Sequence, residues 1–179
     1  ITLQWYDDYA QTFGEDSPEG WQLGLFTEEE AVALSEKTIA SRDYVHEMVS
    51  SLVTTADVQG EVKYIVVSWM KVNPGMETEY VNMEKEIYKL WAEELISREQ
   101  MSYWGIWNVW PYAEGESRYF AVQGFANVEQ LAGTFDSLTP GELGLDMTLE
   151  ELMELTQKTR EMVRQEVWVL VDQVWAEEE

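Results

Sequence analysis

The chain carries one pattern twice. Residues 1–57 resemble residues 119–175 in the same order, with gaps of only a few residues. Self-similarity of this kind restricts the fold, because both copies must form the same kind of unit. The clearest matches join Leu23-Gly24-Leu25 to Leu143-Gly144-Leu145, Thr27 and Glu30 to Thr148 and Glu151, and Lys37 to Lys158.

The two copies differ in length. Residues 62–118 stand ahead of the matched part of the second copy and have no counterpart before the first. We therefore expect a complete unit over residues 62–176 and the second half of another unit over residues 1–58. Two explanations stay open: the natural protein is longer at its N-terminus, or the first unit takes its missing strands from elsewhere.

The charge balance restricts the partners. The 179 residues include 11 basic and 35 acidic side chains, which gives a net charge of -24. Such a chain is repelled by nucleic acid and by anionic membrane surfaces, so we expect neither as a partner. No apolar run approaches the roughly 20 residues of a membrane span, so we expect no membrane insertion.

The same acidity suits a protein that stays soluble in salty water. Because the chain also starts at Ile1 rather than at Met, we expect export from a marine or halophilic bacterium. The protein would then be secreted or periplasmic after removal of a signal peptide.

Hydrophobic periodicity predicts the order of the elements. A strand is predicted over residues 1–6, a helix from Thr27 to about Tyr44, and a strand over residues 47–55. In the second unit the predicted strands cover residues 62–72, 102–110, 118–124 and 166–175, and the predicted helices cover residues 76–98, about 127–135, and Thr148 to near Arg164. This order predicts an α+β fold, with helices on one face of a mainly antiparallel sheet.

The long helix over residues 76–98 is expected to be amphipathic. Its apolar stripe consists of Tyr80, Met83, Ile87, Trp91 and Leu95. Glu84 and Glu86 lie on the same helix, and a solvated helix face explains them.

The segment Met70-Lys71-Val72-Asn73-Pro74-Gly75-Met76-Glu77-Thr78-Glu79-Tyr80 resembles the strand, turn and helix that open a dimeric α/β-barrel domain. The likeness is to the ferredoxin-like, antibiotic-biosynthesis-monooxygenase type, and especially to exported bacterial members with two tandem units and unknown function. It covers residues 62–175, and residues 1–57 as a partial unit. The resemblance implies ferredoxin-like units in tandem, the first incomplete at its N-terminus, and self-association. It leaves the function open, because this superfamily includes oxygenases, haem degraders and proteins of no known reaction.

Aromatic residues are the main candidates for a ligand site. They cluster in or beside the predicted sheet and its covering helix, and the resemblance implies a cavity between those two layers. A pocket lined by aromatic side chains suits a flat apolar ligand. Large aromatics also fill cores and interfaces, and that explanation stays open. The candidate ligand-binding residues are Trp69, Trp91, Tyr103, Trp104 and Trp107.

The resemblance also implies weak catalytic candidates. Cofactor-independent oxygenases of this type orient an aromatic substrate with Asn, Trp and Tyr, which points to Asn108, Trp107 and Tyr103. Strand alternation puts Tyr103 and Trp107 on one face of the strand over residues 102–110, and Asn108 on the other. An Asn at a strand end is also a common turn or edge residue.

Other chemistry has little support. His46 is the only histidine and cysteine is absent, so we expect no metal site. No glycine-rich phosphate loop is present, and we expect no cofactor. Asp172 alternates with apolar residues on the last predicted strand, where Arg118 or Lys63 could pair with it.

Three functions remain. The first is an exported acidic α/β-barrel protein that binds a small apolar or aromatic ligand, with catalysis not assured. The second is a cofactor-independent monooxygenase-like enzyme. The third is a structural or filament-forming subunit that assembles by strand exchange, since an incomplete unit leaves open sheet edges.

Overall fold

The computed structural model divides the chain into two compact units, Ile1–Glu47 and Met48–Glu179. It describes Thr27 and residues 29–30, 32–33, 36–37, 48–56, 58–110, 117–133 and 138–171. The predicted strand over residues 1–6, as well as His46 and Asp172, lies outside the described residues.

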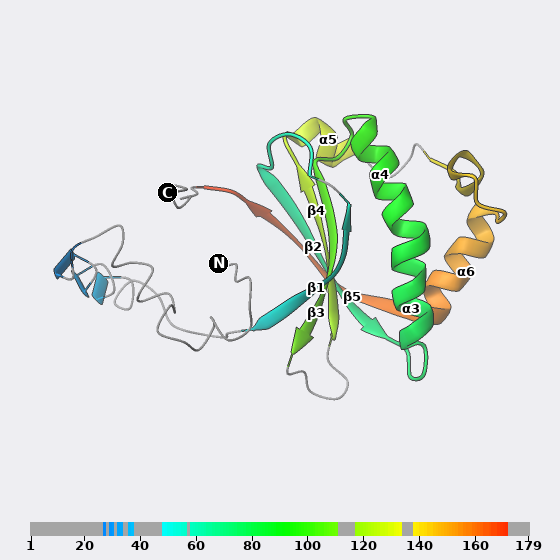
Figure 1. Cartoon of the computed structure of the whole chain (residues 1–179), viewed down its shortest axis with the longest axis horizontal. Helices are drawn as coiled ribbons and strands as arrows, with labels where there is room; N and C mark the ends of the chain where they lie inside the picture. The colour runs from blue at the N-terminus through cyan, green and yellow to red at the C-terminus, as the bar shows by residue number, and fades with distance from the viewer. Residues whose placement is uncertain are drawn as a thin grey trace. The chain divides into compact units, whose positions relative to one another are not determined.

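A five-stranded sheet forms the centre of the second unit (Figure 1). Its strands lie in the order β1-β3-β4-β2-β5, and every neighbouring pair is antiparallel. The mainly antiparallel sheet predicted from the sequence is therefore confirmed. The strands are β1 (Val49–Ala56), β2 (Tyr64–Val72), β3 (Tyr103–Trp110), β4 (Tyr119–Phe125) and β5 (Arg160–Val169).

Strand β1 extends this sheet by one strand beyond the four predicted for the second unit. It corresponds to the strand predicted over residues 47–55, which the repeat assigns to the first unit. It pairs with β3, so that Val49 faces Trp110 and Ala56 faces Trp104. Strand β1 comes before Gly60, yet it forms an edge of the sheet whose other four strands all come after Gly60.

The helices cover one face of the sheet. Figure 1 shows α3, α4 and α6 on the same side of the strands. Helices α3 (Glu77–Met83) and α4 (Lys89–Ser97) are joined without a break by a π-helical turn, η2 (Glu84–Tyr88). The remaining elements are α5 (Val128–Gly133), a 3-10 turn η3 (Pro140–Leu143) and α6 (Leu149–Thr159).

Both copies of the repeat form the same helix start. The Glu151 carboxylate accepts from the Thr148 backbone N–H at 2.7 Å, and the Thr148 hydroxyl accepts from the Glu151 N–H at 3.2 Å. The corresponding distances between Thr27 and Glu30 are 3.0 Å and 3.3 Å. These reciprocal bonds satisfy N–H groups that a helix start leaves unpaired. The tandem arrangement of whole units stays a prediction.

The last helix and the last strand meet earlier than predicted. Helix α6 ends at Thr159 rather than near Arg164, and β5 begins at Arg160 rather than at residue 166. Asn73 explains the position, because its side chain donates to the Lys158 carbonyl at 2.8 Å and its backbone N–H donates to the Thr159 carbonyl at 2.9 Å. These bonds satisfy carbonyl oxygens at the helix end, and Arg160 then pairs with Val72 on β2.

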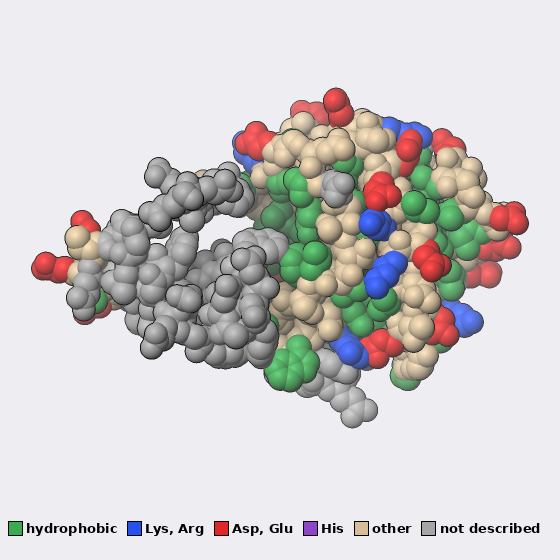
Figure 2. All heavy atoms as spheres, viewed as in Figure 1, with side chains coloured by type: hydrophobic (Ala, Val, Ile, Leu, Met, Phe, Trp, Pro, Cys, Tyr) green, Lys and Arg blue, Asp and Glu red, His purple; other side chains and the backbone are tan. Residues whose placement is uncertain are grey.

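The main core lies between the helices and the sheet. Tyr80, Ile106 and Phe125 are fully buried there, together with Trp104 and Leu95. On the surface, Figure 2 shows Asp and Glu side chains scattered over the described part of the chain, interspersed with Lys and Arg. The ion pair Lys89–Glu93 connects one turn of α4 to the next, and Arg98, directly after α4, pairs with Glu94 of that helix.

Candidate functional site

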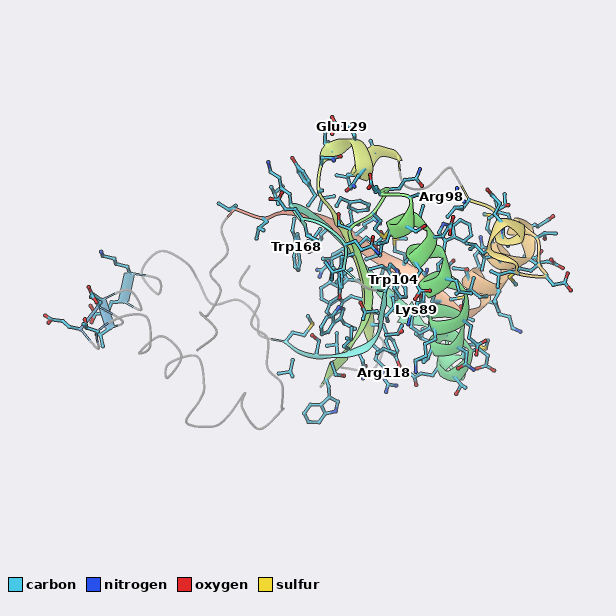
Figure 3. All side chains as sticks on the ribbon, turned by 45° about the horizontal axis from the view of Figure 1, so that its top comes forward. Lys89, Arg98, Trp104, Arg118, Glu129 and Trp168 are labelled. Carbon is cyan, nitrogen blue, oxygen red and sulfur yellow. The ribbon has the colours of Figure 1, made fainter. Side chains whose placement is uncertain are left out.

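Alternation along the strands gives the sheet two different faces. On β2, Val66 and Met70 belong to the core beneath the helices, whereas Val67 belongs to a second apolar cluster on the opposite face. Figure 3 shows the same division, with Trp104 on the helix side and Trp168 on the other side. Helices α3, α4 and α6 of the second unit all lie on the other side of the sheet (Figure 1).

This second face is rich in aromatic rings. The Trp69 and Phe120 ring centroids are 5.1 Å apart, and the Trp107 and Phe120 rings are nearly parallel at 6.3 Å. Such offset arrangements are favourable contacts between aromatic side chains. We call this surface the aromatic face and define it by Val67, Trp69, Trp107, Val109, Phe120, Val122 and Trp168.

Tyr103 lies flat beside the aromatic face because two glycines leave room for it. A Cβ atom on Gly105 would approach the Tyr103 hydroxyl to 2.5 Å, and a Cβ atom on Gly124 would approach the Tyr103 Cβ to 2.8 Å. Burial raises the pKa of Tyr103, against the opposing effect of hydrogen bonds with Thr55 and Trp107. Tyr103 and Trp107 are therefore neighbours, as the alternation of the strand predicted.

Strand β5 provides polar groups at the rim of the aromatic face. The Arg164 guanidinium lies 4.7 Å from the centroid of the Trp69 ring and forms a 3.1 Å ion pair with Glu166. The Trp168 indole N–H donates to the other Glu166 oxygen at 2.9 Å. The Arg164 cation therefore lies near the Trp69 ring, while its ion pair with Glu166 leaves this rim with no net charge.

The sheet separates the five predicted ligand-binding residues into two groups. Trp69, Tyr103 and Trp107 lie on or beside the aromatic face. Trp104 is buried in the core on the helix side, and Trp91 packs against that core from α4. The two groups do not line one pocket, and the packing of Trp91 and Trp104 matches the alternative in which aromatics fill the core.

The three catalytic candidates are divided in the same way. Asn108 pairs with Tyr119 across β3 and β4, and Tyr119 belongs to the helix-side core. Tyr103 and Trp107 point to the opposite face. A single small ligand would therefore contact Asn108 or the other two residues, but not all three. Their catalytic roles stay predictions.

Two of the candidate residues, one on each face of the sheet, have a buried polar atom without a hydrogen-bond partner. These atoms are the indole Nε1 of Trp69 and the side-chain Oδ1 of Asn108. A buried unsatisfied polar atom costs free energy, so each is a point where a ligand group could bind with a gain. Trp69 offers a donor and Asn108 an acceptor.

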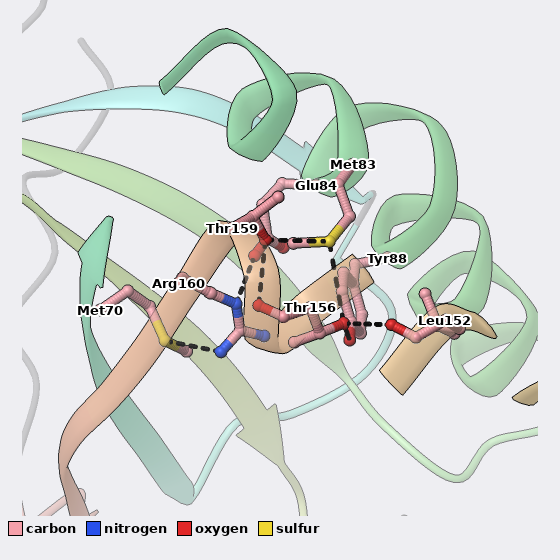
Figure 4. Close-up of polar contacts among 8 residues, drawn as sticks. All are labelled: Met70, Met83, Glu84, Tyr88, Leu152, Thr156, Thr159 and Arg160. Atoms are coloured by element: carbon pink, nitrogen blue, oxygen red, sulfur yellow. Dashed lines mark hydrogen bonds and ion pairs between the residues drawn. The ribbon is translucent and has the colours of Figure 1, made fainter. Parts of the chain in front are cut away.

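A second candidate site lies in the core and was missed from the sequence. Glu84, on the π-helical turn, is 2% exposed and faces Arg160 at the start of β5 (Figure 4). The solvated-face explanation is therefore wrong for Glu84, although it is right for its exposed neighbour Glu86. One signal could have found it, because Glu84 lies four residues after Tyr80 and thus on the apolar stripe.

The contacts of Glu84 and Arg160 are imperfect. The Glu84 Oε1 and Arg160 Nε atoms are 3.3 Å apart, yet neither makes an aligned hydrogen bond. Arg160 directs another N–H to the Met70 thioether at 2.8 Å, a weak acceptor, and lies 5.4 Å from the Tyr88 ring centroid. The Tyr80 hydroxyl is a third buried atom of this group without an aligned partner.

Burial dominates the ionisation of this group. It raises the pKa of Glu84 to about 7, while the Arg160 charge and the Tyr80 hydroxyl act in the opposite direction. Burial and the nearby Glu84 charge raise the pKa of Tyr80 far above its usual range. A carboxyl group with a pKa near neutrality can exchange a proton at physiological pH.

The surrounding polar groups are better satisfied. The Tyr88 hydroxyl and the Thr156 hydroxyl are 2.7 Å apart, and Thr156 also donates to the Leu152 carbonyl. The Thr159 hydroxyl donates to the Thr156 carbonyl at 3.0 Å. The weak point of the cluster is thus the Glu84–Arg160 pair itself.

Arg118, just before β4, is one of the two partners predicted for Asp172, which lies outside the described residues. Arg118 forms an ion pair with Glu77 at the start of α3. Among the described residues, no group of three or more His, Cys, Asp or Glu side chains could hold a metal ion. In that same part of the chain, none of the helices combines the length and the apolar character needed to cross a membrane.

Comparison of the chain with protein-family models finds no match, and comparison with curated proteins finds none either. The function must therefore be argued from the two sites themselves.

Proposed function

We propose that the chain binds a small, uncharged aromatic molecule on the aromatic face. The supporting observation is that the ring centroids of Trp69 and Trp107 lie 5.1 Å and 6.3 Å from that of Phe120, on the face opposite the helices of the second unit. Flat apolar ligands gain both area burial and ring contacts on such a surface.

The charges around the face favour an uncharged ligand. Arg164 and Glu166 are paired, so the rim offers no free ionic partner. The net charge of -24 repels anions from the whole molecule. The unpaired Trp69 indole N–H adds one donor, which suits a ligand with a carbonyl or ether oxygen beside its ring.

A fluorescence titration tests the proposal. N-phenyl-1-naphthylamine is an uncharged aromatic dye whose emission rises in apolar surroundings. We expect saturable binding that Trp107→Leu weakens by about threefold to tenfold, the range for loss of one aromatic contact. Trp91→Leu is the matched control, because it makes the same change on the helix side of the sheet.

Two results would count against this function. One is dye emission that rises without saturation in a protein whose circular dichroism is that of a folded chain. The other is equal weakening by Trp107→Leu and Trp91→Leu, since the aromatic face would then have no special part in binding.

Self-association through β5 is a second candidate function, and a specific observation favours it. Met162, Val163, Val167 and Val169 are each about half exposed on this ten-residue edge strand. Among the described residues, β5 pairs with β2 alone. An edge strand presents unpaired backbone N–H and C=O groups to which another strand can pair, and a partner strand would also cover these exposed Met and Val side chains.

Light scattering tests the association. We expect a particle of at least twice the 20.8 kDa chain mass, reduced to a single chain by Val167→Lys. Val128→Lys is the control, because Val128 is equally exposed on α5, away from the edge. A wild-type particle of 20.8 kDa across the accessible concentrations would rule this candidate out.

A further inference from the structure

The Glu84–Arg160 pair joins two layers of the fold. Glu84 belongs to the helix that runs along the sheet, and Arg160 is the first residue of β5, directly after the end of α6. No loop separates α6 from β5, so whatever holds Arg160 also holds the junction of these two elements. The Glu84 carboxyl group thus contacts Arg160, the residue at which β5 begins (Figure 4).

The ionised form of Glu84 is poorly compensated there. Its Oε1 atom has no aligned hydrogen bond, and Arg160 shares its donors with a thioether. Removing a carboxylate from water is costly unless hydrogen bonds and an opposite charge replace the water. An opening of the α6–β5 junction would return water to both side chains.

The π-helical turn adds a second geometric observation. Residues Glu84–Tyr88 form the only π-helical segment among the described residues, and this segment carries Glu84 itself. Segments of this kind are rare and occur often at functional sites. The wide turn brings both Glu84 and Tyr88 against Arg160.

We propose that Glu84 and Arg160 form a proton-controlled latch, in which loss of the Glu84 proton favours opening of the α6–β5 junction and release of the start of β5 from β2. The pKa of about 7 that burial imposes on Glu84 places this change near neutral pH. The titratable and charged groups that act on Glu84 are Tyr80 from α3, Tyr88 from η2 and Arg160 from β5. Tyr119 from β4 lies behind Tyr80.

Hydrogen exchange followed by mass spectrometry tests the latch on the full chain. Exchange of the peptide covering residues 160–169 is measured at pH 6 and pH 8 and corrected for the intrinsic pH dependence of amide exchange. We expect opening of this segment to be up to about tenfold more frequent at pH 8, the largest change that a single carboxyl with a pKa of about 7 in the closed form can produce over this interval.

Two variants decide the cause. Glu84→Gln carries a neutral side chain at every pH, so its corrected exchange should be the same at pH 6 and pH 8. Glu86→Gln removes an exposed carboxyl two residues away and should behave as the wild type. The latch is overturned if wild-type exchange does not change with pH, or if Glu84→Gln retains the change.

A measurement on the wild type covers the case in which Glu84→Gln does not fold. Carbon-13 NMR of the labelled Glu carboxyl groups should show one resonance that titrates near neutral pH, together with the opening of β5. Titration of every Glu carboxyl in the usual acidic range would overturn the proposal. This inference does not depend on ligand binding at the aromatic face.

Discussion

The buried carboxyl of Glu84 predicts an unusual dependence of stability on pH. The ordinary pKa of 4.5 applies to the unfolded chain, and burial raises the pKa to about 7 in the folded protein. Between these values the folded state binds the proton more tightly, so the free energy of unfolding falls as pH rises from 4.5 to about 7. The contribution is fully present below pH 4.5 and is lost as pH passes the folded pKa.

The size of the effect follows from the change in pKa. A change from 4.5 to about 7, at about 1.4 kcal/mol for each tenfold change in proton affinity, gives about 3 kcal/mol. Urea unfolding at a series of pH values measures it as the difference between the wild type and Glu84→Gln. Taking this difference removes the contributions of all other carboxyl groups, including Glu151, whose capping bonds lower its pKa.

Glu86→Gln serves as the control, because Glu86 is exposed on the same turn. The difference between the wild type and Glu84→Gln should move in favour of the variant as pH rises. A difference that stays constant from pH 4.5 to 8 would refute the reasoning, since Glu84 would then titrate alike in the folded and unfolded states.

Three further stability predictions can be checked by urea unfolding. Gly124→Ala should destabilise the fold by about 1–3 kcal/mol, and by more than Gly105→Ala. The new Cβ at residue 124 would meet the Tyr103 Cβ, which cannot move aside, whereas the one at residue 105 would meet the end of the Tyr103 side chain. Ile106→Ala should cost about 2–5 kcal/mol, since Ile106 is fully buried in the core. Thr148→Ala should cost about 1 kcal/mol through loss of the cap of α6. A larger loss of stability in Gly105→Ala than in Gly124→Ala, or no loss in Ile106→Ala, would contradict the packing described here. No loss of stability in Thr148→Ala would contradict the cap.

Local sequence patterns were enough to predict most of the second unit. A nearly continuous run of β-branched and apolar residues located β2, and alternation along β3 correctly divided Trp104 from Trp107 between the two faces. The threonine and glutamate three residues apart located the start of α6. These features depend on neighbours in the chain, which is why the sequence reveals them.

Features that depend on distant partners were missed. The segment from Arg160 to Gln165 contains good helix formers, and it becomes a strand because β2 pairs with it and Asn73 binds the end of α6. The burial of Glu84 likewise depends on Arg160, which is 76 residues away in the chain. The one local signal, its position on the apolar stripe four residues after Tyr80, was masked by the many glutamates on exposed helix faces.

The division of the aromatic candidates has the same cause. Composition predicted a site rich in Trp, but only the paired strands show that Trp91 and Trp104 fill the core while Trp69 and Trp107 face away from it. The proposed ligand site therefore rests on three of the five predicted residues, Trp69, Tyr103 and Trp107, joined by Phe120 and Trp168, which the sequence did not single out.

The most direct test of the ligand site is an NMR titration of the nitrogen-15-labelled chain with N-phenyl-1-naphthylamine, following the indole N–H signals of the tryptophans. The account predicts saturable shifts of the Trp69 and Trp107 signals, with the Trp91 and Trp104 signals little changed. Shifts confined to Trp91 and Trp104, or no saturable shift at all, would contradict binding at the aromatic face.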